Sequence, residues 1–154
     1  MKKTCQKLNH HHIQDLAAIS RAEGFPYPMT EDVARVYCQS RNTSDPGVQT
    51  YGIFEDDKLV SVMTATFCRV FVCEDSPSGR IAHISGAYTL SDCRHRHYAT
   101  ELLTAIESDA EAFGADYLCC DSTADGLYLR FGMQPTSDDE TRMWKKLKNE
   151  EENI

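Results

Sequence analysis

The stretch that most constrains the fold is residues 81–103, which reads as a strand, a short basic loop and the start of a helix. The loop carries Arg94, His95, Arg96 and His97 in succession, the only dense basic segment in a chain of formal net charge −8. A helix start presents unpaired backbone N–H groups and a partial positive charge, so this loop is suited to a phosphate or pyrophosphate. The alternative is that the four residues form only a solvated turn, the usual fate of a charge run.

The segments on either side of this loop predict a βαβ unit. The strand before it runs from Arg80 to Thr89, and the helix after it ends at Gly114, which tolerates the left-handed conformation of a helix end. Residues 116–121 then read as a short buried strand. Strand, helix and strand in this order place two parallel strands in one sheet. Six helix residues fall on roughly one face and are expected to be buried: Tyr98, Leu102, Leu103, Ile106, Ala110 and Phe113.

The length of 154 residues predicts one domain over residues 1–148, followed by a disordered acidic tail over 149–154. Two amphipathic helices are expected near the N-terminus. The first covers residues 10–23, and the second begins after Thr30, a favourable N-cap. We expect the buried stripe of the second helix to consist of Val33, Val36 and Tyr37.

Between these helices and the βαβ unit, the pattern changes to that of strands. Residues 50–54 and 58–67 are rich in β-forming residues and are divided by a short acidic turn, which predicts a hairpin. A last strand containing Trp144 is expected over residues 141–147. Together these elements predict an α/β fold, in α+β layers, with a mixed central sheet flanked by helices.

Composition excludes several classes of function. The acidic balance argues against nucleic acid as a partner and leaves room for a cationic small molecule or a basic peptide. No apolar run is long enough to span a membrane or to form a signal peptide, so we expect a cytoplasmic protein without a membrane partner. The seven cysteines lack the spacing of zinc ligands, which favours reduced thiols and no metal site.

The loop and the helix start resemble the acetyl-CoA signature of the GNAT superfamily of N-acetyltransferases, a loop of the form Arg-x-x-Gly-x-Gly or Arg-x-x-Gly-x-Ala before a helix. The residues that fit are Arg94, Ala99, Thr100, Leu102 and Leu103. His95 stands where many members have glycine, and His97 replaces the central glycine. We expect His97 either to keep ordinary dihedral angles or to push the phosphates outward.

A second motif strengthens the resemblance. The family's closing helix is usually written Leu-Tyr-x-x-x-Gly-Phe, and its places are taken here by Leu127, Tyr128, Gly132 and Met133. The resemblance covers about residues 48–147 and implies the GNAT fold, with a βαβ core that binds acetyl-CoA. It further implies an acetyl-CoA-dependent N-acetyltransferase that acts by direct amine attack in a ternary complex.

The resemblance also implies the site residues. Backbone N–H groups of the loop would bind the pyrophosphate, and the strand before it would bind the pantetheine amides. The cofactor-binding candidates are Ala87, Tyr88, Thr89, Arg94, His95, Arg96, His97, Tyr98, Ala99 and Thr100. Phe25 and Tyr27, on the connection between the first two helices, are candidates to line the acceptor pocket; the equally open alternative is that they only cover the edge of the core.

By the same resemblance, Tyr128 matches the family's general-acid tyrosine. A phenol with an ordinary pKa near 10 is protonated at neutral pH and can donate to a thiolate. The general base is less clearly marked. His83 and Ser85 lie two residues apart, on one face of a strand, and His83 is the candidate to accept the amine proton. Structural roles for Tyr128 and His83 stay open, as does a minority route through Cys119 or Cys120 as nucleophile.

Two functions of different class therefore compete. The leading hypothesis is an acetyltransferase that acts on a small-molecule or peptidyl amine. The runner-up is a non-catalytic GNAT-like module that binds acyl-CoA or has lost that ability. A nucleotide-binding α/β protein is disfavoured because the chain has no glycine-rich dinucleotide or phosphate loop. Relatives often pair as dimers, so a homodimer remains open.

Overall fold

The computed structural model describes residues 1–39, 47–121, 126–136 and 142–147. Within them the chain forms one seven-stranded sheet in the order β1-β2-β3-β4-β5-β7-β6. The strands are β1 (Lys3–Lys7), β2 (Val48–Glu55), β3 (Lys58–Arg69), β4 (Arg80–Thr89), β5 (Tyr117–Cys120), β6 (Gln134–Pro135) and β7 (Met143–Lys146). The expected tail, residues 149–154, lies outside the described residues.

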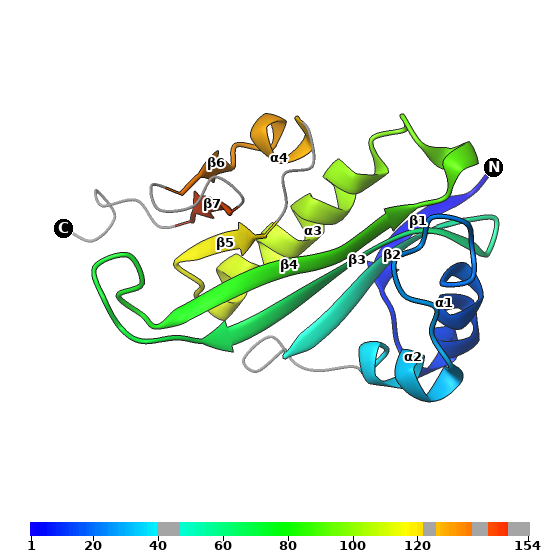
Figure 1. Ribbon diagram of the computed structural model, residues 1–154, viewed down its shortest axis with the longest axis horizontal. Helices are drawn as coiled ribbons and strands as arrows, with labels where there is room; N and C mark the ends of the chain where they lie inside the picture. Colours follow the sequence, from blue (N-terminus) through cyan, green and yellow to red (C-terminus); the bar gives the residue numbers. More distant parts are fainter. Residues whose placement is uncertain (40–46, 122–125, 137–141, 148–154) are drawn as a thin grey trace.

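The predicted hairpin and βαβ unit are confirmed. β2 and β3 pair antiparallel through the acidic turn, and β4 and β5 are parallel, joined by helix α3 (Tyr98–Phe113). Figure 1 shows α3 running behind the sheet. The six residues expected on its inner face are all buried, and Gly114 ends the helix at φ 84°. A single apolar face repeated along 16 residues leaves the helix one way to pack.

Strand β1 was not predicted from the sequence. It pairs antiparallel with β2 at the edge of the sheet, with Lys3 opposite Glu55. Its sequence, Lys-Thr-Cys-Gln-Lys, is largely polar, and none of its residues is fully buried. A strand of this kind is held by backbone hydrogen bonds to its neighbour, so it leaves no apolar alternation to recognise.

The N-terminal helices lie on the face of the sheet opposite α3. A short 3₁₀ turn (His10–His12), capped by the Asn9 side chain, precedes α1 (Ile13–Ile19), so the first helix is shorter than expected. Helix α2 (Glu31–Tyr37) begins after Thr30, whose hydroxyl accepts from the Val33 N–H as predicted. A membrane-crossing helix is absent from the described part of the chain.

The predicted buried stripe of α2 is wrong at its two valines, whereas Tyr37 is half-buried and packs against the core beneath α1 and α2. Val33 and Val36 are 45% and 52% exposed, whereas Ala34 and Cys38 are fully buried. The small Ala34 side chain lets the short helix approach α1 closely, which turns the bulkier valines toward solvent. The most hydrophobic residues of α2 are therefore not the ones that it buries.

Alternate residues of the sheet serve two separate cores. Ile53 and Met63 belong to the large core beneath α3, whereas their neighbours Phe54 and Val62 belong to the smaller core beneath α1 and α2. Side chains of a strand point to alternate faces, so both faces of β2 and β3 are buried. This fixes the centre of the sheet rigidly, next to the point where β4 and β5 separate.

Candidate active site

A cavity of about 720 Å³ opens where β4 and β5 separate. The two strands pair only over Ala82–Ile84 and Leu118–Cys120, and Figure 1 shows β4 continuing past the end of β5. The described residues that line the cavity come from β3, β4, the basic loop, the start of α3, the position after β5 and the short helix α4 (Leu127–Arg130). Segments that are far apart in the sequence therefore line the same cavity.

A β-bulge in β4 shapes this opening. The pairing of β3 with β4 shifts between Val62 and Thr64, so two residues of β4 face Met63 alone. Gly86 lies at the shift with φ 62°, a left-handed conformation suited to glycine. The extra residue reverses the faces of the strand: Ile84 packs beneath α3, whereas Tyr88 packs beneath α1 and α2. Ser85, Gly86 and Ala87 are left exposed at the cavity.

The basic loop keeps the backbone conformation that glycine would take. His95 and His97 have φ of 66° and 62°, and both line the cavity. Of the two alternatives expected for His97, ordinary dihedral angles are therefore excluded. Left-handed residues other than glycine cost on the order of 1–3 kcal/mol each, so the surrounding structure must hold this loop.

The first turn of α3 is open toward ligands. His97 is its N-cap residue, and no side chain caps the turn. Among the described residues, the first backbone hydrogen bond of the helix runs from the Glu101 N–H to the His97 carbonyl. The N–H groups of Tyr98, Ala99 and Thr100 precede this bond and lie beside the cavity, where an anion fits.

A carboxylate from another part of the chain holds the loop. Glu55, at the end of β2, accepts hydrogen bonds from the Tyr98 hydroxyl and from Nη1 of Arg96 at 2.6 Å, and its other oxygen lies 3.7 Å from the Cys93 thiol. Arg96 is therefore ion-paired and does not line the cavity. The Tyr98 hydrogen bond, together with Arg96, holds the pKa of Glu55 below its ordinary value.

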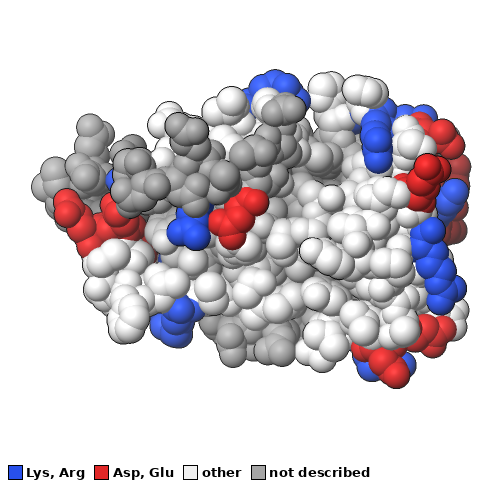
Figure 2. All heavy atoms as spheres, viewed as in Figure 1, with Lys and Arg blue, Asp and Glu red and all other residues white. Residues whose placement is uncertain are grey.

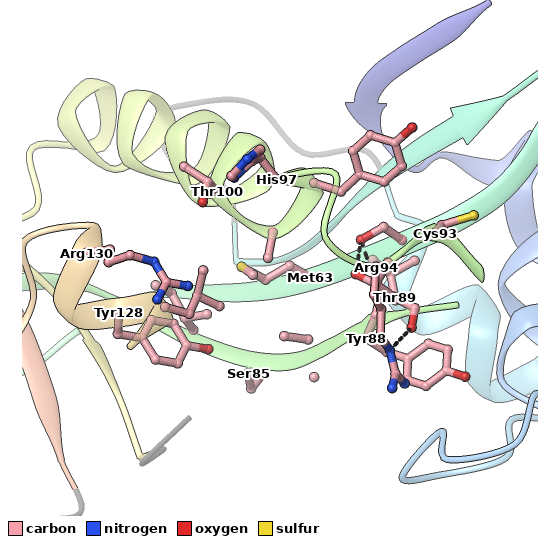
Figure 3. A pocket seen from close by; sticks show the side chains of 18 of the residues that line it. Met63, Ser85, Tyr88, Thr89, Cys93, Arg94, His97, Thr100, Tyr128 and Arg130 are labelled. Carbon is pink, nitrogen blue, oxygen red and sulfur yellow. Dashed lines mark hydrogen bonds between the residues drawn. The ribbon is translucent and has the colours of Figure 1, made fainter. Parts of the chain in front are cut away.

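Arg94 is attached to the end of β4, beside the cavity. Its Nε donates to the Thr89 carbonyl at 3.1 Å, and its guanidinium lies 5.9 Å from the ring centre of Tyr88. Figure 3 shows the guanidinium beside Tyr88, with the dashed line to Thr89. The Tyr88 hydroxyl in turn donates to the Glu23 carbonyl at 2.6 Å. This wall of the cavity is therefore tied to the segment after α1.

The proposed general acid, Tyr128, lies across the cavity on α4. Its side chain is buried, and none of the described residues hydrogen-bonds its hydroxyl, which Figure 3 shows pointing into the cavity. Burial, with a smaller contribution from Cys120, raises the pKa of Tyr128 to about 12. The phenol therefore carries its proton at neutral pH.

Arg130, which the sequence did not single out, also points into the cavity from α4 in Figure 3. Its Nη1 would lie 2.6 Å from a Cβ on Gly126, so glycine at that position leaves room for the guanidinium. Within the described chain, Arg130 has no carboxylate within ion-pair distance. It supplies a positive charge on the side of the cavity opposite the basic loop.

The base candidate His83 has a carboxylate partner that sequence reasoning missed. Its Nε2 lies 3.1 Å from Oδ2 of Asp121. The other oxygen of this carboxylate, Oδ1, accepts from Nε of Arg142 at 3.0 Å. Arg142 first, and then His83, hold the pKa of Asp121 below its ordinary value. The only signal in the sequence was that an acidic residue directly follows a buried strand. His83, Ser85 and Asp121 all line the cavity.

The acceptor-pocket candidates lie elsewhere. The Phe25 ring packs against Tyr88 at 4.9 Å, on the face of the sheet that carries α1 and α2, and Tyr27 is 72% exposed. Neither side chain lines the cavity. Phe25 instead supports the wall formed by Tyr88.

The cysteines offer little support for a nucleophile. All seven are free, and burial raises the pKa of Cys119 to about 12, which disfavours its thiolate. Cys119 and Cys120 do not line the cavity. In the part of the chain that the structure describes, no cluster of His, Cys, Asp and Glu is suited to a metal ion.

The model of the acetyltransferase (GNAT) family matches residues 12–133. No curated protein sequence matches the chain significantly.

Solved structures share the fold at low sequence identity. A predicted acetyltransferase from Clostridium acetobutylicum, crystallised with acetyl-CoA, is 17% identical, with a TM-score of 0.70 over 90% of this chain and 94% of its own. NAA60 from Arabidopsis thaliana, in complex with acetyl-CoA, is 10% identical, with a TM-score of 0.74 over 95% and 99%. AAC(6')-Iy, in complex with the bisubstrate analogue CoA-S-monomethyl-acetylneamine, is 12% identical, with a TM-score of 0.70 over 89% and 94%.

Proposed function

Because this chain belongs to the acetyltransferase (GNAT) family, we propose that it transfers an acetyl group from acetyl-CoA to a primary amine by direct attack in a ternary complex. The observation that carries the proposal is that one cavity holds both the Tyr128 hydroxyl, which no described residue hydrogen-bonds, and the uncapped first turn of α3. A proton donor and an anion site are the two features that such a reaction requires of the protein.

The cavity fits the donor at two places. The N–H groups of the first turn of α3, with the neighbouring left-handed backbone at His95 and His97, are suited to the pyrophosphate. Beyond Ile84, no described strand pairs with the β5 side of β4, so its backbone is suited to the amides of the pantetheine arm. Acetyl-CoA, when bound, supplies an acyl group activated as a thioester.

The side chains then divide the proton transfers between them. The Nε2–H of His83 donates to Asp121, so Nδ1 is the nitrogen that can accept the proton of the attacking amine, directly or through a water molecule. As the new C–N bond forms and the C–S bond breaks, the Tyr128 hydroxyl gives its proton to the departing thiolate. Asp121 stays ionised and holds the imidazole in place.

The acceptor is an amine on a small molecule or a peptide. NAA60 and AAC(6')-Iy, an aminoglycoside N-acetyltransferase, were both solved with bisubstrate analogues. Among the described lining residues of this chain only Asp121 is acidic, and it is paired. Figure 2 shows charged side chains mainly toward the edges of this face, with a broad uncharged surface between them. The described site therefore favours an acceptor amine that the protein recognises through other contacts as well as through its positive charge.

The retained loop geometry argues against the non-catalytic alternative, because the two histidines do not displace the backbone from the left-handed conformation. A calorimetric titration with acetyl-CoA, CoA and ATP tests the donor. We expect acetyl-CoA and CoA to bind and ATP to bind much more weakly. A panel of amines with a thiol-release assay then tests transfer; a folded protein that binds no acetyl-CoA would refute the proposal.

A further inference from the structure

Glu55 contacts the basic loop on both sides of its strained residues. Cys93 precedes the loop, Arg96 lies inside it and Tyr98 follows it, and all three side chains meet this one carboxylate. The Glu55 side chain is only 13% exposed. These contacts join β2 to a loop about 40 residues further along the chain.

The position of Glu55 is itself fixed by the sheet. Its backbone pairs with Lys3 of β1 and Lys58 of β3. The turn that follows is tied to β1, because the Asp56 N–H donates to the Lys2 carbonyl at 2.9 Å and the Lys2 N–H donates to the Asp56 carboxylate at 2.8 Å. The carboxylate therefore extends from a rigid base.

The loop residues alternate in direction. His95 and His97 line the cavity, whereas Arg96 between them turns to Glu55. Both histidines have a left-handed backbone, which an unsupported loop would leave for an ordinary conformation. Contacts that fix Arg96 and Tyr98 therefore restrain the peptide groups on both sides of His97.

We propose that Glu55 is the positioning residue of the donor site: by holding Arg96 and Tyr98 it keeps His95 and His97 left-handed and the N–H groups of the α3 first turn directed at the cavity. The proposal rests on the proposed function for its donor, acetyl-CoA. Glu55 does not line the cavity, so it acts through the loop.

A competing role for the Glu55 carboxylate predicts the opposite change in CoA affinity. If Arg96 were itself the phosphate ligand, Glu55 would compete with the donor for the same guanidinium. Removing the negative charge would then free Arg96 and strengthen CoA binding. The sign of the change in affinity therefore separates the two roles.

The test is a calorimetric titration of Glu55→Gln with CoA. We expect binding to weaken by about tenfold, because a small displacement of pre-organised groups is costly. Glu107→Gln is the matched control: it removes another α3-contacting ion pair, to Lys145 at 2.6 Å, that does not touch the loop. We expect its affinity to change by less than about threefold. Unchanged or tighter binding in Glu55→Gln would overturn the proposal.

Glycine at positions 95 and 97 supplies a second test, whose result a general destabilisation of the protein by Glu55→Gln would not change. Glycine adopts positive φ without help, so His95→Gly combined with His97→Gly should make the loop independent of Glu55. In that background we expect Glu55→Gln to weaken CoA binding by less than about threefold. An equal loss in both backgrounds would show that Glu55 does not act by holding the histidines.

Hydrogen exchange without any ligand separates this proposal from the proposed function. If Glu55 holds the loop, amides of residues 93–98 should exchange faster in Glu55→Gln than in the parent, with those of β3 unchanged. Tyr98→Phe, which keeps the ring, should show part of the same increase. This result is independent of whether the protein binds CoA; loop exchange equal to that of the parent would contradict the proposal.

Discussion

The Tyr98 hydroxyl donates a hydrogen bond to the Glu55 carboxylate and so connects the first turn of α3 to the end of β2. Arg96 shares the same carboxylate. The loop residues that the family motif places beside the donor therefore have different roles. His95 and His97 face the cavity, whereas Arg96 is ion-paired with Glu55 and supports the loop.

This relationship predicts how stability depends on pH. The folded-state pKa of Glu55 lies below its ordinary value of 4.5, first because of Tyr98 and then because of Arg96. Its contribution to stability is therefore complete above the unfolded-state pKa and is lost as the pH falls through the folded-state pKa. We expect the Tm difference between the parent and Glu55→Gln to be constant near neutral pH and to shrink below about pH 4.5. A difference that persists unchanged in acid would contradict this assignment.

Substitution of Tyr128 by phenylalanine should remove the proton donor and leave the donor site intact. We expect kcat to fall by about 100-fold and the affinity for CoA to change by less than about threefold. Because the pKa of Tyr128 is about 12, loss of this proton should not reduce the activity of the parent below about pH 10. Steady-state kinetics and calorimetry measure both effects. Tyr117→Phe, outside the cavity, is the control, and equal losses in both variants would argue against a catalytic role.

His97→Gly should stabilise the protein without creating a better donor site. The backbone at His97 is already left-handed, so glycine relieves strain but adds entropy to the unfolded chain, for a net gain of about 0.5–1 kcal/mol. Thermal unfolding should show a Tm about 1–3 °C higher. We expect CoA affinity to change by less than about threefold. A large gain in affinity would instead mean that the histidine obstructs the phosphates.

Arg130→Ala should weaken donor binding through charge. Its guanidinium is unpaired among the described residues and points into the cavity. We expect CoA affinity to fall by about three- to tenfold at low ionic strength and by less in salt, because screening weakens the attraction. Arg130→Lys should retain part of the affinity. Arg35→Ala, on the exposed surface of α2, should have no effect; equal losses at both arginines would indicate a general charge effect.

Gly86→Ala tests the bulge that opens the cavity. A Cβ at Gly86 would meet Thr64 atoms at 3.6 Å and 3.8 Å, which are ordinary contacts, so the cost comes from the positive φ. We expect a loss of about 1–2 kcal/mol and a Tm lower by about 2–6 °C. Gly86→Asn should lose less, because asparagine tolerates the left-handed conformation better. Identical losses for alanine and asparagine would point to sterics.

Part of the fold could be predicted from the sequence because its determinants are local. The buried face of α3, its end at Gly114 and the parallel pairing of β4 with β5 follow from a repeat of apolar residues and the order of elements. Where that local signal was absent or ambiguous, prediction failed. The polar strand β1 was missed, and the valines of α2 were assigned to the wrong face.

The motif residues of the site could likewise be predicted from the sequence, since the loop and Tyr128 each lie in a contiguous segment. The residues that contact them could not be predicted. Glu55 meets Arg96 and Tyr98 from 41 and 43 residues away, and Asp121 meets His83 from 38 residues away. Such pairs form only when the sheet places distant strands side by side. The sequence by itself thus determined the family, the βαβ core and many of the residues that line the cavity. The tertiary structure decided which candidates face the cavity and which partners they meet, because side-chain direction depends on a bulge, a left-handed loop and long-range hydrogen bonds that leave no local pattern.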